Sequence, residues 1–445
     1  MTVKRKLRSF LLNILVSSKV RGVRRWLRER RRRLLGRPHR ISVFLQLDDP
    51  YSYLLAYYLP SLAEHCDIEL RLYLSEARGD EYQPAPEMLA EYAIMDCERL
   101  AMELGIPFLD KGTSPPVEHR LSMLYAIAAC RGNENFDEEF LQALNVFWRG
   151  DAEAAARRNT GADMNGMADN VIAESQTLQQ RLGHYNSGTL HYEGEWYWGV
   201  DRLHYLLDRL VALGAIREDS PNPLLASIRQ AMQVSLPVAP PAAAKSLPPL
   251  ELFHSFRSPY SYLALRRIFE IADAYGLELR LRPVLPMVMR GMQVPRAKLL
   301  YILTDAAREA DRLGIGFGKI ADPVGHGAER CLAVFRHAES EKRGRDFLLN
   351  AGEAIWDQGI DVATDAGMRK VAAETGLFWP DVKAAMEDDG WQRLAEKNRE
   401  SMMASGSWGV PTIRMGDFVA WGQDRDWLLV RHIEELCDTG DGILV

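Results

Sequence analysis

The stretch Phe253-His254-Ser255-Phe256-Arg257-Ser258-Pro259-Tyr260-Ser261-Tyr262-Leu263 has the pattern of a buried strand, a sharp turn and the first turn of a helix. Pro259 suits the first helical position because its φ is already helical and it has no N–H to leave unpaired. Ser258 would then be the N-cap, with its hydroxyl beside the unpaired N–H groups of the helix. Because such a helix end favours negative charge, the turn is either an ordinary cap or a place that holds an anion or a thiolate.

The same motif occurs 209 residues earlier, as Asp49-Pro50-Tyr51-Ser52-Tyr53-Leu54. The offset of 209 is kept further along the chain, from Leu104-Gly105-Ile106 to Leu313-Gly314-Ile315. Later, Trp198-Gly199 recurs as Trp421-Gly422 at an offset of 223. A constant offset over about 65 residues indicates two copies of one fold.

Four segments follow from this repeat and from composition. Residues 1–40 form a basic arm, either amphipathic or disordered, and residues 41–234 form the first copy. Residues 235–249 are rich in proline and alanine, which predicts an extended, semi-rigid linker. Residues 250–445 form the second copy.

The second copy has the pattern of an α/β protein. The expected elements are a strand at Leu250–Phe253, a helix at Pro259–Tyr275, a strand at 277–282, helices over 296–404 with breaks at Gly314, Pro323, Gly359 and Gly376, strands at Thr412–Met415 and Phe418–Trp421, and a last helix from about Asp424. This order, β-α-β, a helical insertion and β-β-α, is typical of a thioredoxin-like fold with a helical lid. The fold class is therefore two tandem thioredoxin-like domains, each with a helical insertion.

Charge is divided unevenly along the chain. The arm holds 15 Lys and Arg against one acidic residue, a net of +14, while the remainder has 40 Lys and Arg against 60 Asp and Glu, a net of −20. An acidic body argues against a general nucleic-acid binder, although the arm alone could contact an anionic surface. The five cysteines form no C-x-x-C and no metal-ligand cluster, which disfavours disulfide exchange and a metal site and makes a reducing cytoplasm the default.

The arm allows two interpretations. Its apolar run Phe10–Val16 is too short to span a bilayer and lacks a cleavage site, so neither a membrane span nor a signal peptide is expected. Apolar residues recur among the cations at roughly helical spacing, a pattern that suits an interfacial helix on anionic lipid at the inner face of the membrane. The alternative is a disordered basic tail.

Four motifs in order resemble those of one family. They are Ser258-Pro259-Tyr260-Ser261-Tyr262-Leu263, Lys298…Tyr301…Asp305…Arg308, Trp408-Gly409-Val410-Pro411-Thr412 and Trp421-Gly422-Gln423-Asp424-Arg425. The family is that of the DsbA-like 2-hydroxychromene-2-carboxylate isomerases and kappa-class glutathione transferases. The resemblance covers nearly all of 250–440, and residues 41–220 resemble the same fold more weakly.

This resemblance implies a site for glutathione. Ser258 would donate a hydrogen bond to the glutathione sulfur and, with the helix N-terminus, lower the thiol pKa. Val410 would pair with the glutathione backbone beside a cis Pro411. Gln423 and Asp424 would hold the γ-glutamyl end of glutathione.

The resemblance also suggests groups for acidic substituents and a reaction. Lys298 would lie near the glycyl carboxylate or an acidic substrate, with Asp305 as an accompanying polar residue. The family chemistry of the isomerases is thiolate addition to an unsaturated or ring-opened aromatic ketone, bond rotation and elimination. A kappa-type transferase would instead conjugate glutathione to an aromatic or hydrophobic electrophile or reduce a peroxide. His254 and Arg257 depart from the family pattern beside the turn, and a lone His on a strand is more often a core group than a base.

The first copy departs further from the family. Asp49 stands at the position of Ser258, Leu89 at that of Lys298 and Gly188 at that of the expected cis-proline, Pro411. Because a carboxylate at the helix N-terminus would repel a thiolate, this copy is predicted to be catalytically silent. It could stand in for a second subunit, as an intramolecular pseudo-dimer, or the chain could form a homodimer.

Structural alternatives stand beside these roles. Ser258 and Asp424 could be plain helix caps, and Asp305 with Arg308 an i,i+3 pair. Trp408 and Trp421 are expected to pack rather than to bind substrate. The second class of function is a non-catalytic binding or scaffold protein, held at the membrane by its arm, because a fold alone does not choose a function.

Overall fold

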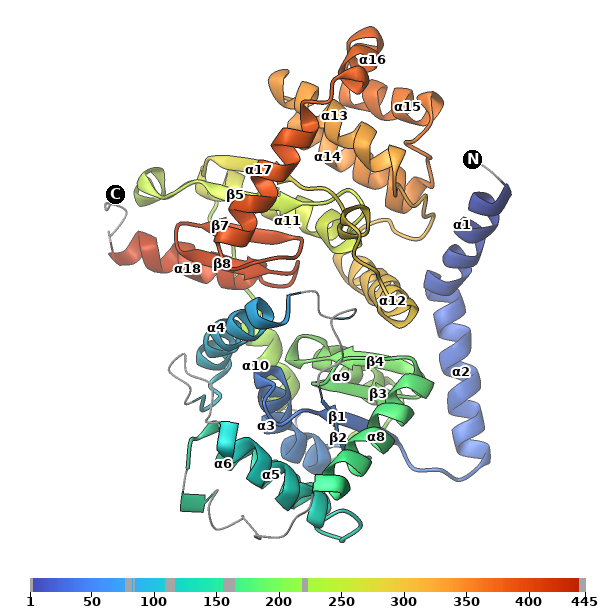
Figure 1. Cartoon of the computed structure of the whole chain (residues 1–445), viewed down its shortest axis with the longest axis vertical. Coiled ribbons are helices and arrows are strands. Elements are labelled where there is room, and N and C mark those ends of the chain that lie inside the picture. Colours follow the sequence, from blue (N-terminus) through green and yellow to red (C-terminus); the bar gives the residue numbers. More distant parts are fainter. Residues whose placement is uncertain are drawn as a thin grey trace. The chain divides into compact units, whose positions relative to one another are not determined.

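The computed structural model describes residues 3–76, 82, 85–108, 117–151, 153–154, 165–217 and 223–439. Internal contacts divide the chain into two units. The C-terminal unit comprises Met1–Arg24, Val234–Val294 and Leu299–Val445, and the N-terminal unit comprises Arg25–Gln233 and Pro295–Lys298. Each unit contains a four-stranded mixed sheet, which confirms the predicted α/β class (Figure 1).

The sheet of the C-terminal unit has the strand order β6-β5-β7-β8. β5 (Leu250–His254) pairs in parallel with β6 (Leu279–Pro283) and antiparallel with β7 (Thr412–Met415), which pairs with β8 (Phe418–Trp421). All five residues of β5 are buried. A strand with neighbours on both sides and covered faces is expected to be mostly apolar, and in β5 the apolar Leu250, Leu252 and Phe253 stand beside two buried polar side chains, Glu251 and His254.

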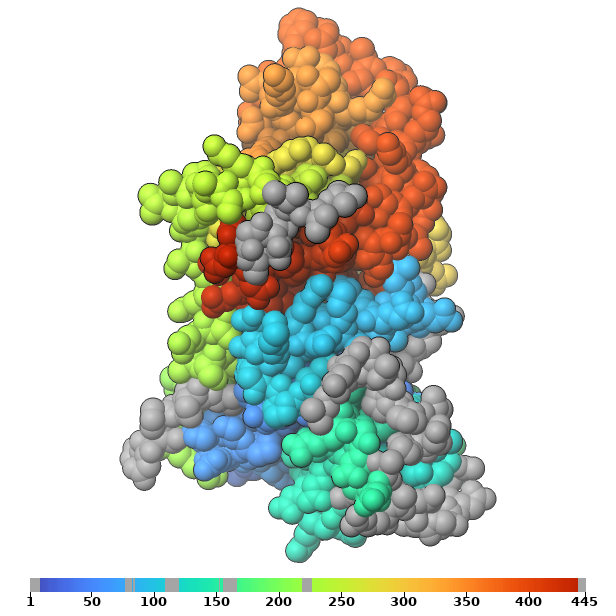
Figure 2. All heavy atoms as spheres, turned by 90° about the vertical axis from the view of Figure 1, so that its left-hand side faces the viewer, coloured from blue at the N-terminus to red at the C-terminus, as the bar shows by residue number. Residues whose placement is uncertain are grey.

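Helices surround this sheet and form the insertion. They are α11 (Pro259–Tyr275), η3 (Met287–Arg290), α12 (Arg296–Leu313), α13 (His326–Ser340), α14 (Gly344–Glu353), the π-helical turn η4 (Ala354–Gln358), α15 (Asp365–Thr375), α16 (Trp379–Glu387), α17 (Trp391–Ala404) and α18 (Asp426–Thr439). Figures 1 and 2 show α13–α16 gathered as one orange group within this unit. The predicted breaks at Gly314, Pro323, Gly359 and Gly376 all fall between these helices.

Local signals account for α11, whose predicted bounds are confirmed. Ser258 is its N-cap and Pro259 its first residue. Gly276 ends it with φ +66°, a left-handed conformation that glycine adopts without a steric penalty. The turn before α11 and the helix itself are therefore fixed by residues next to each other in the sequence.

The predicted linker is partly folded, which corrects the expectation of an extended chain. Residues Ala242–Ser246 form the 3-10 helix η2, and Ala244 is buried. η2 packs against α18 of the C-terminal unit. Small alanine side chains between the prolines allow this close approach, so this part of the linker belongs to the C-terminal unit.

The arm is helical rather than disordered. It contains α1 (Val3–Val16) and α2 (Ser18–Leu34), separated by Ser17. Backbone bonds from Ser17 N to Asn13 O and from Arg21 N to Ser17 O continue the helical pattern across this break. None of the described helices combines the length and the apolar character needed to cross a bilayer.

The N-terminal unit repeats the plan, with strand order β2-β1-β3-β4. Its elements are β1 (Arg40–Leu45), α3 (Pro50–His65), β2 (Glu69–Leu74), α4 (Pro86–Leu104), α5 (Val117–Ala129), α6 (Phe136–Trp148), α8 (Asn165–Leu182), β3 (Thr189–Tyr192), β4 (Glu195–Trp198), η1 (Val200–Arg202), α9 (Leu203–Ala212) and α10 (Pro223–Ala231). Individual contacts repeat as well: Tyr53 Oη donates to Pro107 O in this unit, as Tyr262 Oη does to Gly316 O in the other.

Candidate functional site

Ser258 lies half-buried at the N-terminus of α11. Its Oγ accepts a hydrogen bond from Ser261 N at 3.1 Å, which confirms the predicted cap. The same hydroxyl donates to the carbonyl of Val410 at 3.3 Å. Hydrogen bonds donated by a hydroxyl to an oxygen are usually about 2.5–3.0 Å long, so this one is weak. A stronger acceptor could therefore replace the Val410 carbonyl as the partner of Ser258.

Val410 and Pro411 approach this turn from the start of β7. Their peptide bond is cis, as the resemblance implied. The Val410 side chain packs on a buried cluster of Phe253, Val284 and Met402. One side of the Ser258 hydroxyl is therefore a polar helix terminus, and the Val410 side is backed by an apolar cluster.

Arg257, the residue before Ser258, is held by Asp322. Its Nε lies 2.9 Å from Asp322 Oδ1 and its Nη2 lies 3.3 Å from Oδ2, a two-point pair. Asp322 Oδ1 also accepts from Val324 N at 3.1 Å. Sequence analysis noticed Arg257 but missed Asp322, which lies 65 residues away and carries no local signal except a turn-forming Asp-Pro dipeptide.

His254 lies at the end of β5, beneath the turn. It is buried, its ring centroid lies 4.9 Å from that of Phe256 with the two rings nearly perpendicular, and its Nδ1 has no hydrogen-bond partner among the described residues. Burial lowers the pKa of His254 to about 3. The imidazole is therefore neutral at ordinary pH and packs as a core group, the reading that the sequence favoured.

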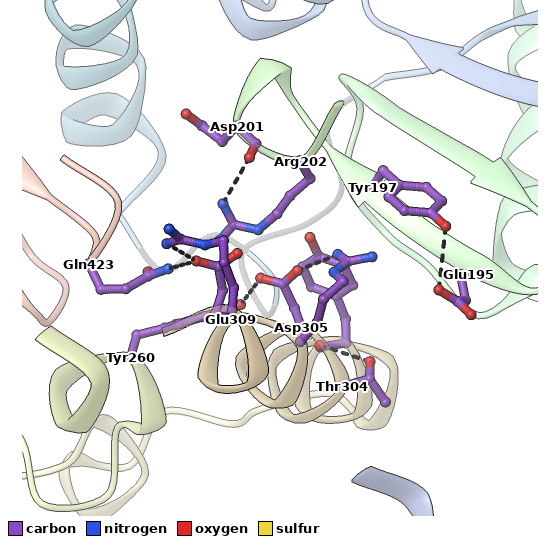
Figure 3. A network of polar contacts seen from close by, with 12 residues as sticks. Glu195, Tyr197, Asp201, Arg202, Tyr260, Thr304, Asp305, Glu309 and Gln423 are labelled. Carbon is purple, nitrogen blue, oxygen red and sulfur yellow. Dashed lines mark hydrogen bonds and ion pairs between the residues drawn. The ribbon is translucent and has the colours of Figure 1, made fainter. Parts of the chain in front are cut away.

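Gln423 and Asp424 follow β8. Gln423 Nε2 donates to Glu309 Oε2 at 3.1 Å (Figure 3). The same Glu309 oxygen lies 3.0 Å from Arg312 Nη2. Asp424 Oδ1 lies 3.6 Å from Arg425 Nη1. α18 begins at Asp426 and Arg425 O accepts from Leu429 N, so the alternative of Asp424 as the helix cap is wrong.

Asp305 is buried in α12 and bonded on both oxygens. Tyr260 Oη donates to its Oδ2 at 2.8 Å (Figure 3). Arg308 pairs with its Oδ1. In the N-terminal unit, Asp96 accepts from Tyr51 Oη at the same 2.8 Å. A contact kept in both units favours a structural role, in which the aspartate fastens α12 or α4 to the helix after the turn.

Lys298 lies in the first turn of α12, in the segment that groups with the N-terminal unit. Its Nζ donates to Tyr82 O at 2.6 Å. Burial lowers the pKa of Lys298 to about 8. The structure thus gives the amine a backbone acceptor within the N-terminal unit.

Arg290 is a cation that sequence analysis did not single out. It ends η3, is half-buried, and its Nε has no hydrogen-bond partner among the described residues. Burial and, next, the nearby Arg399 lower the pKa of Arg290. Met289 of the same turn accepts a contact from Gly325 N at 3.4 Å, three residues after Asp322.

The equivalent turn of the N-terminal unit is occupied by its own aspartate. Asp49 caps α3 by accepting from Tyr51 N at 3.2 Å and Ser52 N at 3.1 Å, and it lies within bonding distance of the hydroxyls of Ser52 and Ser187. Burial raises the pKa of Asp49, and these hydrogen bonds oppose the rise. The carboxylate thus uses the donors that an added anion would need.

Strand register identifies the residue opposite this turn. Thr189 pairs with Phe44 as Thr412 pairs with Phe253. Gly188 therefore takes the place of Pro411, as the motif alignment predicted. A Cβ at Gly188 would lie 3.2 Å from Asp49 Oδ2, so the glycine permits the close approach of this loop to the turn.

Comparison with known proteins agrees with the fold of the C-terminal unit. Residues 249–434 match the family model of the DSBA-like thioredoxin domain, and this part of the chain is therefore a domain of that kind. It is similar to the 2-hydroxychromene-2-carboxylate isomerase of Pseudomonas putida, with 23% identity over 196 residues, 42% of this chain and 95% of the relative. The isomerase of Sphingobium xenophagum is 23% identical over 184 residues, 40% of this chain and 93% of the relative. A solved 2-hydroxychromene-2-carboxylate isomerase structure aligns with 43% of this chain and 96% of its own at 23% identity and a TM-score of 0.38.

Proposed function

We propose that the C-terminal unit is a glutathione-dependent isomerase or transferase that acts on an aromatic or hydrophobic electrophile. The observation that carries the proposal is the place of Ser258 Oγ, at the N-terminus of α11 and 3.3 Å from the carbonyl of Val410 beside the cis bond to Pro411. A glutathione thiolate at this point would be stabilised by the helix N-terminus and by one hydroxyl donor.

The hydroxyl would change its acceptor when glutathione binds. Without a ligand, Ser258 donates to Val410 O over a long contact. A thiolate is a charged acceptor, and charge-assisted hydrogen bonds are about twice as strong as neutral ones. The freed Val410 carbonyl would then accept from the glutathione backbone, which pairs with this segment like an added strand.

Charged and polar residues are proposed for the ends of the ligand. Gln423 and Asp424 would bind the γ-glutamyl group, with Gln423 exchanging its bond to Glu309 for the ligand. Lys298, Asp305 and Arg290 are assigned to the glycyl carboxylate or to an acidic substrate. Of these, Arg290 has the strongest support because its Nε is unpaired, whereas Asp305 is bonded on both oxygens.

The proposed isomerisation returns the thiol unchanged. The thiolate sulfur adds to an unsaturated carbon conjugated with a carbonyl, forming a C–S bond while the electron pair moves to the carbonyl oxygen. Rotation about the resulting single bond and collapse of the enolate then expel the thiolate, so no glutathione is consumed. A kappa-type transferase would instead protonate the adduct and release the conjugate, or would reduce a peroxide. Each reaction needs reduced glutathione and hence a reducing compartment such as the cytoplasm.

The N-terminal unit is proposed as a second thioredoxin-like domain without catalysis. Asp49 fills the turn with its own carboxyl group, and Gly188 replaces the proline. This unit would take the place of a second subunit, so that one chain forms an intramolecular pseudo-dimer. The alternative is that two chains form a homodimer.

A non-catalytic binding or scaffold protein is the second candidate. The observation that favours it is that Ser258 already has a structural task, since it caps α11 as Asp49 caps α3. In that case the hydroxyl would serve the helix alone.

Calorimetric titration of reduced glutathione distinguishes the two candidates. The variants are Ser258→Ala and, as a matched control, Thr364→Ala, because Thr364 is the N-cap of α15 and accepts from Gly367 N at the same 3.1 Å. Both variants lose one cap, which costs about 1 kcal/mol of stability. The proposal predicts binding to the wild type and to Thr364→Ala, and binding at least about tenfold weaker to Ser258→Ala, which corresponds to 1.4 kcal/mol. If the wild type did not bind glutathione at millimolar concentration, the proposal of a glutathione-dependent enzyme would be wrong.

A further inference from the structure

One face of α1 is seated on the C-terminal unit. Ser9 Oγ donates to Ile320 O at 2.5 Å, and Asn13 Oδ1 accepts from Ile320 N at 3.2 Å. Val16, one turn further along, is buried. Residues 9, 13 and 16 lie on one side of a helix with 3.6 residues per turn, so this side attaches the helix to the 318–320 loop.

The neighbouring face of α1 is apolar and exposed. Phe10, Leu11 and Ile14 fall within about 100° of one another on the helix, on the side away from Ser9 and Asn13. All three are exposed large hydrophobic side chains. α1 therefore attaches to the protein through two polar groups and Val16, and it leaves its larger apolar side chains outside, whereas an ordinary surface helix turns them inward.

α2 shows the same inversion. Arg25 makes a two-point pair with Glu195, with both distances 2.6 Å. On the opposite side of the helix, Val23, Trp26, Leu27 and Leu34 form a stripe at spacings of 3, 1 and 7 residues, and Trp26 and Leu34 are 57% and 78% exposed. A packed helix would bury such a stripe.

Cations border the stripe of α2. Exposed Arg24 and Arg31 lie on one flank and exposed Arg33 on the other, at about 80–100° from its centre. Arg30 lies within the stripe itself, one turn after Trp26, and its guanidinium lies over the Trp26 ring, 5.4 Å from its centroid. Arginines beside an apolar stripe can reach phosphates while the apolar side chains enter the lipid, an arrangement typical of interfacial helices.

We propose that α1 and α2 lie on an anionic lipid bilayer, with the two apolar faces in the headgroup region and the arginines on lipid phosphates. The net charge of +14 in residues 1–40 complements a negative bilayer surface, and Trp26 is the residue type enriched at that depth. A nucleic acid would satisfy the charge but would leave Phe10, Leu11 and Leu27 in water. The inference does not depend on glutathione binding, so the two are tested separately.

Co-sedimentation of the full-length chain with vesicles tests this inference. The vesicles are neutral phosphatidylcholine alone or phosphatidylcholine mixed with anionic phosphatidylglycerol. The first variant is Trp26→Ser with Leu27→Ser, and its matched control is Phe378→Ser, which removes an aromatic side chain that is at least as exposed (69%, against 57% for Trp26) from outside the arm. A second variant, Arg24→Gln with Arg31→Gln, removes flanking charge and keeps the apolar stripe.

We expect the wild type and Phe378→Ser to bind anionic vesicles at least about tenfold more tightly than neutral ones. The Trp26/Leu27 variant should lose at least about tenfold in affinity for anionic vesicles, and the Arg24/Arg31 variant about tenfold or more. Equal binding by the wild type and the Trp26/Leu27 variant would overturn the proposal. So would a lipid-free dimer that the Trp26/Leu27 substitutions dissociate, or retention on RNA with no binding to vesicles.

Discussion

Replacement of His254 by phenylalanine should make the stability of the C-terminal unit less sensitive to acid. His254 is buried against the edge of Phe256, and its Nδ1 has no partner among the described residues. Burial lowers its pKa from 6.5 to about 3 in the folded chain. In the unfolded chain the imidazole takes up a proton below pH 6.5, whereas in the folded chain it stays neutral until about pH 3.

The sign and size of the effect follow from this difference. Between those two pH values the unfolded state binds one more proton, so the free energy of unfolding falls as the pH falls, by about 1.4 kcal/mol per pH unit. The contribution is absent above pH 6.5 and reaches about 2 kcal/mol at pH 5. Phenylalanine fills a similar volume and has no proton to bind.

Urea unfolding at about pH 7, 6 and 5 measures the effect. The free energy of unfolding of His254→Phe, relative to the wild type, should rise by about 1.4 kcal/mol per pH unit on acidification below pH 6.5. The substitution His326→Phe is the control for loss of a histidine, because the His326 side chain is 66% exposed, and it should keep the wild-type slope. If the free energy of unfolding depended on pH in the same way in the wild type and in His254→Phe, the inference that His254 is neutral in the folded chain would be refuted.

Three further substitutions test contacts of the two units by urea unfolding. Tyr260→Phe should lower the free energy of unfolding by about 1–3 kcal/mol, because buried Asp305 loses a donor; no loss would mean that the remaining partners of Asp305 satisfy the carboxylate. Glu251→Gln should cost about 3 kcal/mol, since Glu251 lies between the guanidinium groups of two arginines on β6 and β7; a cost under about 1 kcal/mol would show that water screens the cluster. Asp49→Ala should cost about 1–2 kcal/mol through the lost cap and should create no glutathione binding; gained binding would contradict the silent N-terminal unit.

Elements specified by neighbouring residues could be predicted from the sequence. The bounds of α11, β7 and β8 agree with the expectation, because caps, prolines and glycines act within one turn of the chain. The cis bond before Pro411 came from the family resemblance. These features depend on residues that are adjacent in the sequence or that belong to a recognisable motif.

Features that depend on distant partners could not be predicted. The pair of Arg257 and Asp322 joins residues 65 positions apart, and neither residue type identifies the other. The contacts of α1 with Ile320 join Ser9 and Asn13 to a residue that lies 311 and 307 positions further along the chain. The partner of Lys298, the carbonyl of Tyr82, is a backbone group that every residue carries. Single-sequence patterns contain no signal for such pairings.

The most direct test of the Ser258 proposal is the pKa of bound glutathione. The ultraviolet absorbance of the thiolate is followed as the pH is raised, in complexes with wild type, Ser258→Ala and Thr364→Ala. The proposal predicts that the thiol titrates well below its ordinary value of about 8.5 in the wild type and in Thr364→Ala, and about one pH unit higher in Ser258→Ala. The same titration in all three complexes would show that Ser258 caps α11 and has no part in holding a thiolate.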